Sequence, residues 1–192
     1  MDLIEPPRVV KRSEMSYVGI RVVTPFRGML RVRDELLMEL NEWLRARGIE
    51  AGPFFLRLNV IDMDGPMDLE VGAVTKDAPA GDERVRQALL PAGDYATLTY
   101  RDHAIRANRA LIEWAAAHDL RFDRQVEPDG DRFACRYEAY LTDPFTERRK
   151  TKWEVELNTL TATGAHLVIT QRNKVIFCRN YTLGGPANGT AC

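Results

Sequence analysis

Residues 152–160 read KWEVELNTL, an alternation of apolar and polar side chains that is typical of a half-buried strand. Successive side chains of a strand point to opposite faces, so the apolar residues of this stretch share one face, which we expect to pack on helices. The opposite face carries the polar residues Glu154, Glu156 and Asn158. Two carboxylates within three residues make this polar face the first candidate for a functional site.

The centre of that strand, VEL at residues 155–157, has an earlier counterpart in LEV at residues 69–71. Each strand follows a segment with helical spacing that contains an L-x-E-W sequence, ending at Trp43 in one case and at Trp114 in the other. We expect both tryptophans to lie in the core. The shared order of these features predicts a β-α-β-β unit of the SHS2 type that is used twice.

The two predicted halves cover about residues 8–80 and 84–160, and each has one helix and about three strands. One such half alone has too small a hydrophobic core to fold stably without the other. We therefore predict that the halves pair about a pseudo-two-fold axis into one α+β domain over residues 1–160, with an antiparallel sheet.

The stretch FACRYEAYL at residues 133–141 is the predicted neighbour of the last strand, and Arg136, Glu138 and Tyr140 share one of its faces. Antiparallel pairing predicts a sheet face that bears Glu156 together with Glu138 and Tyr140. This face has two interpretations, which strand parity leaves open. It is a solvated outer face, or it is a concave site whose aromatic wall and carboxylate favour flat or cationic ligands. Such a site can also raise the pKa of a glutamate for acid–base chemistry.

Composition excludes several classes of protein. The 192 residues carry 27 basic and 28 acidic side chains, a net charge of -1, without the basic clusters of a nucleic-acid binder. No apolar run approaches the roughly 18 residues of a membrane span. Three cysteines without C-x-x-C spacing form neither a disulfide framework nor a zinc site. Without an apolar leader at the N-terminus, we expect a cytoplasmic protein that contacts neither nucleic acid nor membrane.

Motifs for metals, cofactors and nucleophilic catalysis are missing from the sequence. The three histidines form no H-E-x-x-H pair, and the two serines lie in no G-x-S-x-G turn. No glycine-rich loop is placed to hold a phosphate. We therefore expect no metal and no cofactor.

Residues 161–192 differ from the rest of the chain, because they carry three basic residues and no acid and leave a balance of -4 for residues 1–160. We expect a C-terminal extension in which residues 166–170 and 174–178 form a hairpin, at a sheet edge or in a homodimer contact. We expect residues 184–192 to be disordered. The acidic body fits a pocket that prefers cations.

Four segments together carry a resemblance to a known family. They are residues 60–63 (VIDM) running into 67–72 (MDLEVG), 90–96 (LPAGDYA), 138–144 (EAYLTDP) and 152–157 (KWEVEL). In this order and spacing, over about residues 8–160, the chain resembles the GyrI-like small-molecule-binding domain. The same domain is the effector-binding module of AraC-type and MerR-type multidrug regulators.

The resemblance implies an aromatic pocket between the two halves, with a glutamate on the last strand that meets the positive or polar group of the ligand. By motif match that glutamate is Glu156, and Tyr140 and Tyr95 are candidate walls. The family often has Thr before the glutamate, where this chain has Val155, and Glu154 adds a second acid. Glu70, the counterpart of Glu156 in the first half, is interpreted as structural. The predicted ligand-binding residues, of which the last two rest on strand parity alone, are Glu156, Tyr140, Glu138, Tyr95, Glu154, Phe55 and Arg57.

Three functions follow from the resemblance. The first is a stand-alone module that senses or sequesters hydrophobic and often cationic small molecules, because the arm before Tyr17 is too short for a helix-turn-helix. The second is a hydrolase that opens the cyclopropane ring of DNA-alkylating natural products by addition of water and so confers resistance, with Glu156 as the catalytic carboxylate. The third is an interaction protein that resembles gyrase inhibitors.

Overall fold

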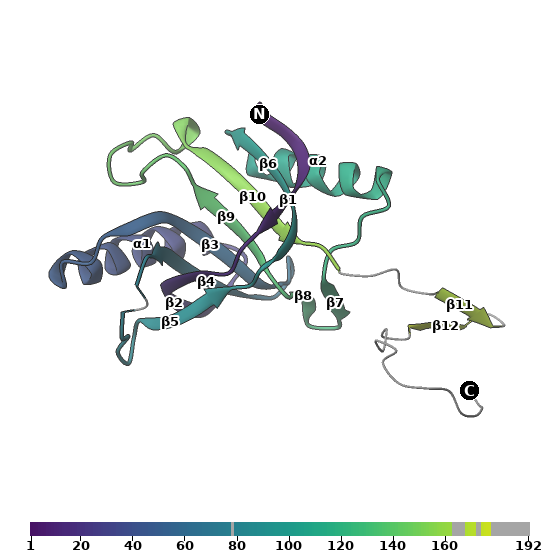
Figure 1. Cartoon of the computed structure of the whole chain (residues 1–192), viewed down its shortest axis with the longest axis horizontal. Coiled ribbons are helices and arrows are strands. Elements are labelled where there is room, and N and C mark those ends of the chain that lie inside the picture. Colours follow the sequence, from purple (N-terminus) through teal and green to yellow (C-terminus); the bar gives the residue numbers. More distant parts are fainter. Residues whose placement is uncertain (78, 163–167, 172–173, 178–192) are drawn as a thin grey trace. The chain divides into compact units, whose positions relative to one another are not determined.

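The computed structural model describes residues 1–77, 79–162, 168–171 and 174–177 (Figure 1). The chain divides into two compact units, Met1–Ala162 and Thr163–Cys192. In the second unit, β11 (Val168–Gln171) and β12 (Lys174–Phe177) pair antiparallel, with Val168 opposite Phe177. The tail that we expected at residues 184–192 lies outside the described residues.

The first unit is an α+β structure, as predicted. Its helices are α1 (Met29–Ala46) and α2 (Ala104–Ala117), and a short 3-10 turn covers Lys150–Lys152. Its strands are β1 (Asp2–Arg12), β2 (Met15–Pro25), β3 (Ala51–Ile61), β4 (Pro66–Thr75), β5 (Arg86–Leu90), β6 (Gly93–Arg101), β7 (Arg124–Glu127), β8 (Gly130–Phe133), β9 (Arg136–Tyr140) and β10 (Glu154–Leu160).

The strands form one antiparallel sheet in the order β1-β6-β10-β9-β3-β4-β2-β5, and β8 of the β7–β8 hairpin joins it at β3 (Figure 1). The succession β2-α1-β3-β4 is followed, after β5, by β6-α2-β9-β10, with β7 and β8 inserted after α2. Strands β3 and β9 meet at the centre of the sheet. The evolutionary duplication of the two halves remains a prediction.

Both helices cover the same face of the sheet and bury their apolar stripes there. Helix α1 packs on β2, β3 and β4, and α2 packs on β1 and β6. The leucines of α1 at positions 36, 37, 40 and 44 are buried, and the helix ends before Gly48, whose φ of 64° is the left-handed conformation that glycine adopts without strain. Trp43 and Trp114 are only partly buried at the margin of this core. None of the helices in the described residues has the length and apolarity to cross a membrane.

Two features of the N-terminal and central strands differ from the prediction. Residues 2–12, which we left without structure, form the edge strand β1 against β6. Residues 133–141, predicted as one strand, divide into β8 and β9. The reason is that the amide of Ala134 leaves the ladder and donates to the carbonyl of Asp123 (2.9 Å), while the carbonyl of Cys135 accepts from Leu160 (2.9 Å).

Candidate functional site

The face of the sheet that carries no helix, called here the helix-free face, has its own buried cluster. Four aromatic rings form a chain across it, in the order Tyr17, Phe55, Tyr137 and Tyr95. Successive ring centroids lie 5.0, 5.6 and 6.0 Å apart in edge-to-face geometry. All four side chains are at most 3% exposed. Phe55 and Tyr95 were among the predicted ligand-binding residues, and the structure places both in this buried cluster.

Small residues make room for this cluster. Gly72 lies opposite Phe55 in the sheet, and a Cβ atom at Gly72 would lie 2.2 Å from Cζ of the Phe55 ring. The neighbouring Gly19 lies opposite Gly72, and a Cβ atom there would lie 2.8 Å from Oε1 of Glu70. Glycine at both positions lets the ring and the carboxylate lie directly against the sheet.

The prediction that Glu138 and Tyr140 share a sheet face with Glu156 is wrong. In the β9–β10 register, Tyr140 lies opposite Val155 and Glu138 lies opposite Leu157, so both point to the helix-covered face, away from Glu156. The correct partner of Glu156 is Ala139. Strand alternation fixes which residues share a face within one strand, but a shift of one residue between strands exchanges the faces.

Contacts on the helix-covered face explain both residues. The Tyr140 ring packs against Trp153, at 5.2 Å between centroids, and the buried guanidinium of Arg33 lies 5.9 Å from its centre. Glu138 accepts a hydrogen bond from the side-chain amide of Asn108 on α2 (3.3 Å). These two residues stabilise the packing of the helices.

Glu156 lies on the helix-free face, as predicted, but other side chains of the chain already bind it. Its Oε1 accepts from Nη2 of Arg12 on β1 (2.5 Å) and from Nδ2 of Asn158 (3.0 Å). The Glu156 side chain is 15% exposed. Glu154 pairs with Arg101. Glu154 and Glu156 are thus both held by arginines of other strands, and neither carboxylate lines either of the two main pockets among the described residues.

A cavity of about 430 Å³ opens on the helix-free face, and residues from both predicted halves line it. Its walls come from β2, β3, β4 and β5 and from the loop before β5. Of the predicted residues, only Arg57 lines it. Glu70, which we interpreted as structural, also lines it, and so do Tyr17 and Gly19.

A hydrogen-bonded chain of three side chains forms one wall of this cavity. Nη1 of Arg57 donates to the hydroxyl of Tyr17 (3.0 Å), and that hydroxyl donates to Oε2 of Glu70 (2.9 Å). Burial raises the pKa of Glu70, and the hydrogen bond from Tyr17 and the charge of Arg57 offset this only in part. Burial and the neighbouring Glu70 charge also raise the pKa of Tyr17, so its hydroxyl stays protonated. Glu70 is thus a carboxylate whose charge is incompletely compensated.

The charges around the cavity are close to balance. Its lining carries the arginines at 21, 57, 84 and 86 and the acids Glu70 and Glu83. Two acids that do not line the cavity compensate two of these arginines: Asp68 binds Arg21 (2.5 Å), and Glu39 binds Arg84 (2.7 Å). The cavity therefore offers both a hydrogen-bond acceptor and several donors, rather than one dominant sign of charge.

Arg12, Tyr17 and Tyr137 were not among the predicted site residues, and Glu70, which we interpreted as structural, lines the cavity. For Glu70 a signal existed, because it occupies the same position in LEV as Glu156 occupies in VEL. Nothing in the sequence indicated Arg12, because β1 was not predicted. No group of three or more side chains suited to hold a metal ion occurs within the part of the chain that the structure describes.

Several solved structures share this fold. The crystal structure of the EcmrR C-terminal domain has a TM-score of 0.62 at 14% identity, over 83% of this chain and 99% of that domain. EcmrR in its complex with DNA has a TM-score of 0.62 at 12% identity, over 82% of this chain and 57% of EcmrR. An uncharacterized conserved protein from Listeria innocua has a TM-score of 0.56 at 11% identity, over 82% of this chain and 93% of that protein.

At these identities the likeness shows the fold alone, and it fits the GyrI-like fold that the four sequence segments implied. The chain spans little more than half the length of EcmrR in the DNA complex. No protein-family model matches the chain, and no curated protein matches it.

Proposed function

We propose that this chain binds a flat aromatic small molecule in the cavity beside Glu70. The observation that carries the proposal is the combination of a cavity of about 430 Å³ with a buried, undercompensated carboxylate in its wall. The volume lies in the range of about 300–1,000 Å³ that is typical of ligand pockets, although the walls of this cavity are mostly polar, whereas most ligand pockets have mainly apolar walls. The GyrI-like fold agrees with a role in sensing or sequestering such a molecule.

The chemistry of the wall defines the ligand. Because burial disfavours the charged form of Glu70, a ligand that donates an N–H group or brings positive charge stabilises that form. Arg57 and Arg86 supply donors for an acceptor group on the same ligand. The cation preference that we inferred from the sequence is therefore transferred from Glu156 to Glu70.

The hydrolase alternative assigned catalysis to Glu156. Glu156 lines neither the cavity beside Glu70 nor the other main pocket among the described residues, and its Oε1 is held by Arg12 and Asn158, so we do not propose that step.

The test is a fluorescence titration of the full chain with proflavine, a flat aromatic cation with two amino donors. Wild-type protein should bind it, and Glu70→Gln should weaken binding about tenfold, which corresponds to the loss of roughly 1.4 kcal/mol. The matched control is Glu83→Gln, which removes the same charge from the exposed rim of the cavity and should have little effect. Absence of binding by the wild type, or equal dissociation constants for the two variants, would contradict the proposal.

A further inference from the structure

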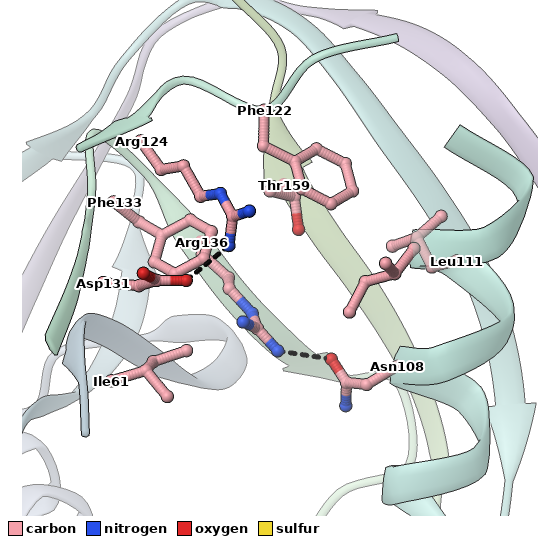
Figure 2. A pocket seen from close by; sticks show the side chains of 10 residues that line it. Ile61, Asn108, Leu111, Phe122, Arg124, Asp131, Phe133, Arg136 and Thr159 are labelled. Atoms are coloured by element: carbon pink, nitrogen blue, oxygen red, sulfur yellow. Dashed lines mark hydrogen bonds and ion pairs between the residues drawn. The ribbon is translucent and has the colours of Figure 1, made fainter. Parts of the chain in front are cut away.

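A separate pocket lies on the helix-covered face of the second half, beneath α2 and beside the β7–β8 hairpin (Figure 2). Its volume is about 130 Å³. Most of its wall is apolar and comes from Ile61, Leu111, Phe122 and Phe133. Leu111 and Phe133 are buried, at 2% and 7% exposure. The pocket shares no lining residue with the cavity beside Glu70.

The guanidinium of Arg136 projects into this pocket from β9 (Figure 2). Its Nη2 donates to Oδ1 of Asn108 on α2 (2.6 Å), and its Cζ lies 5.0 Å from the centre of the Phe133 ring. Burial lowers the pKa of Arg136, and the charges of Glu138 and Asp131 offset this only in part. Among the described residues, no carboxylate lies within the 4 Å of an ion pair with Arg136.

The other charged groups around Arg136 are already engaged. Asp131 pairs with Arg124 across the β7–β8 hairpin, as Figure 2 shows. Glu138 accepts from Nδ2 of Asn108, whose Oδ1 holds Arg136 (3.3 and 2.6 Å). Asn108 is thus the bridge between Arg136 and its nearest acid on β9. An arginine has five N–H donors in a planar fork, so Arg136 has donors to spare for a ligand.

An arginine fork at the base of an apolar pocket matches one ligand chemistry. A carboxylate accepts two parallel N–H bonds from a guanidinium, which a point charge cannot do. A hydrocarbon group attached to it would lie against Phe122, Phe133 and Leu111. A cavity of roughly 150 Å³ holds a benzene ring, so the size agrees with one small ring or branched chain.

We propose that this pocket is a second ligand site, which binds a small aromatic or branched aliphatic monocarboxylate with its carboxylate on Arg136. The site is independent of the proposed cavity beside Glu70, because the two lie on opposite faces of the sheet. A dianion such as phosphate is disfavoured, because the pocket offers it only one guanidinium that is not already in an ion pair, and the rest of the wall is mostly apolar.

The test is calorimetric titration of the full chain with benzoate, with benzamide as the neutral analogue of the same shape and inorganic phosphate as the small anion. Benzoate should bind at least tenfold more tightly than either. Arg136→Lys keeps the charge but removes the fork, and it should weaken benzoate binding at least fivefold. Equal affinity for benzoate and benzamide, or for benzoate and phosphate, would overturn the assignment.

A second pair of variants guards against a folding defect at Arg136. Ile112, which is 51% exposed, lies on α2 at the mouth of the pocket, so Ile112→Asp places a negative charge there without disturbing the core. This variant should lose benzoate binding and keep proflavine binding. Ile105→Asp, on the same helix at a 73% exposed position outside the pocket, should keep both. Unchanged benzoate binding by Ile112→Asp would refute the site, whereas loss of proflavine binding alone would bear only on the cavity beside Glu70.

Discussion

The substitution Tyr17→Phe tests the hydrogen-bonded chain that builds the candidate site. It removes one hydroxyl, which donates to Glu70 and accepts from Arg57, and it keeps the aromatic ring. The edge-to-face contact with Phe55 at 5.0 Å is retained, so no cavity in the core contributes to the change. The effect therefore isolates two hydrogen bonds to charged groups at a residue that is 1% exposed.

The expected loss is about 2–3 kcal/mol of unfolding free energy, because a hydrogen bond to a charged group contributes about 1.5–3 kcal/mol and Arg57 retains a bond to the carbonyl of Ala134 (3.2 Å). The loss should depend on pH. The Tyr17 hydroxyl lowers the pKa of Glu70 against the effect of burial, so its removal raises that pKa further. When the pKa of a carboxyl group is higher in the folded than in the unfolded state, the protein becomes less stable as the pH rises from the unfolded-state pKa through the folded-state pKa. Tyr17→Phe should therefore destabilise the protein more at about pH 8 than at about pH 4.5.

The assay is urea unfolding of wild type and variant at both pH values. Tyr140→Phe is the matched control, because the Tyr140 hydroxyl is also buried but has no hydrogen-bond partner among the described residues. Its removal should cost less than about 0.5 kcal/mol, at either pH. A Tyr17→Phe loss as small as that of the control, or a loss that is greater at the lower pH, would show that the Tyr17 hydroxyl does not stabilise the charged form of Glu70.

Three further predictions concern the same face of the sheet. Gly72→Ala should lower stability by about 1–3 kcal/mol in urea unfolding, because the new Cβ would lie 2.2 Å from the Phe55 ring. Arg12→Gln should cost about 1.5–3 kcal/mol in the same assay, because it leaves Glu156 without its cationic partner at 15% exposure. Burial raises the pKa of Cys135, so mass spectrometry should show that this thiol is alkylated far more slowly in the folded protein than in denaturant.

Each of these predictions has a control on the chain. Gly52→Ala introduces a Cβ at an ordinary 3.5 Å from Val74, and it should be tolerated if crowding is the cause at Gly72. Arg8→Gln breaks an exposed pair with Glu5, which should contribute less than about 1 kcal/mol. Equal losses within either pair of variants would contradict the respective explanation, and rapid alkylation of Cys135 in the folded chain would contradict its burial.

The α+β architecture was predictable because periodicity alone identifies its principal elements. The leucines of α1 recur at helical spacing, and Met67, Leu69, Val71 and Ala73 of β4 alternate toward the helices. Edge strand β1 escaped prediction because Pro6 and Pro7 argue against a strand. An edge strand tolerates proline, and the register of β1 shifts between Glu5 and Arg8 around these residues.

The site was predictable only in part, because its composition depends on register and on burial. Parity, which needs only one strand at a time, put Phe55 and Arg57 on one face of β3, and the structure places both on the helix-free face, where Arg57 lines the cavity and Phe55 is buried. Tyr140 and Glu138 required the register between β9 and β10, which no local pattern encodes. The choice of Glu70 over Glu156 required knowledge of Arg12, which lies 144 residues from Glu156 in the sequence.

Two-dimensional NMR of the full chain during a titration with proflavine would locate the bound ligand on the sheet. If proflavine binds beside Glu70, the largest amide shifts occur at Gly19, Arg57 and Glu70, with much smaller shifts around Glu156. Shifts centred on Glu156 and Arg12, or spread over the surface without saturation, would exclude the cavity beside Glu70 as the binding site.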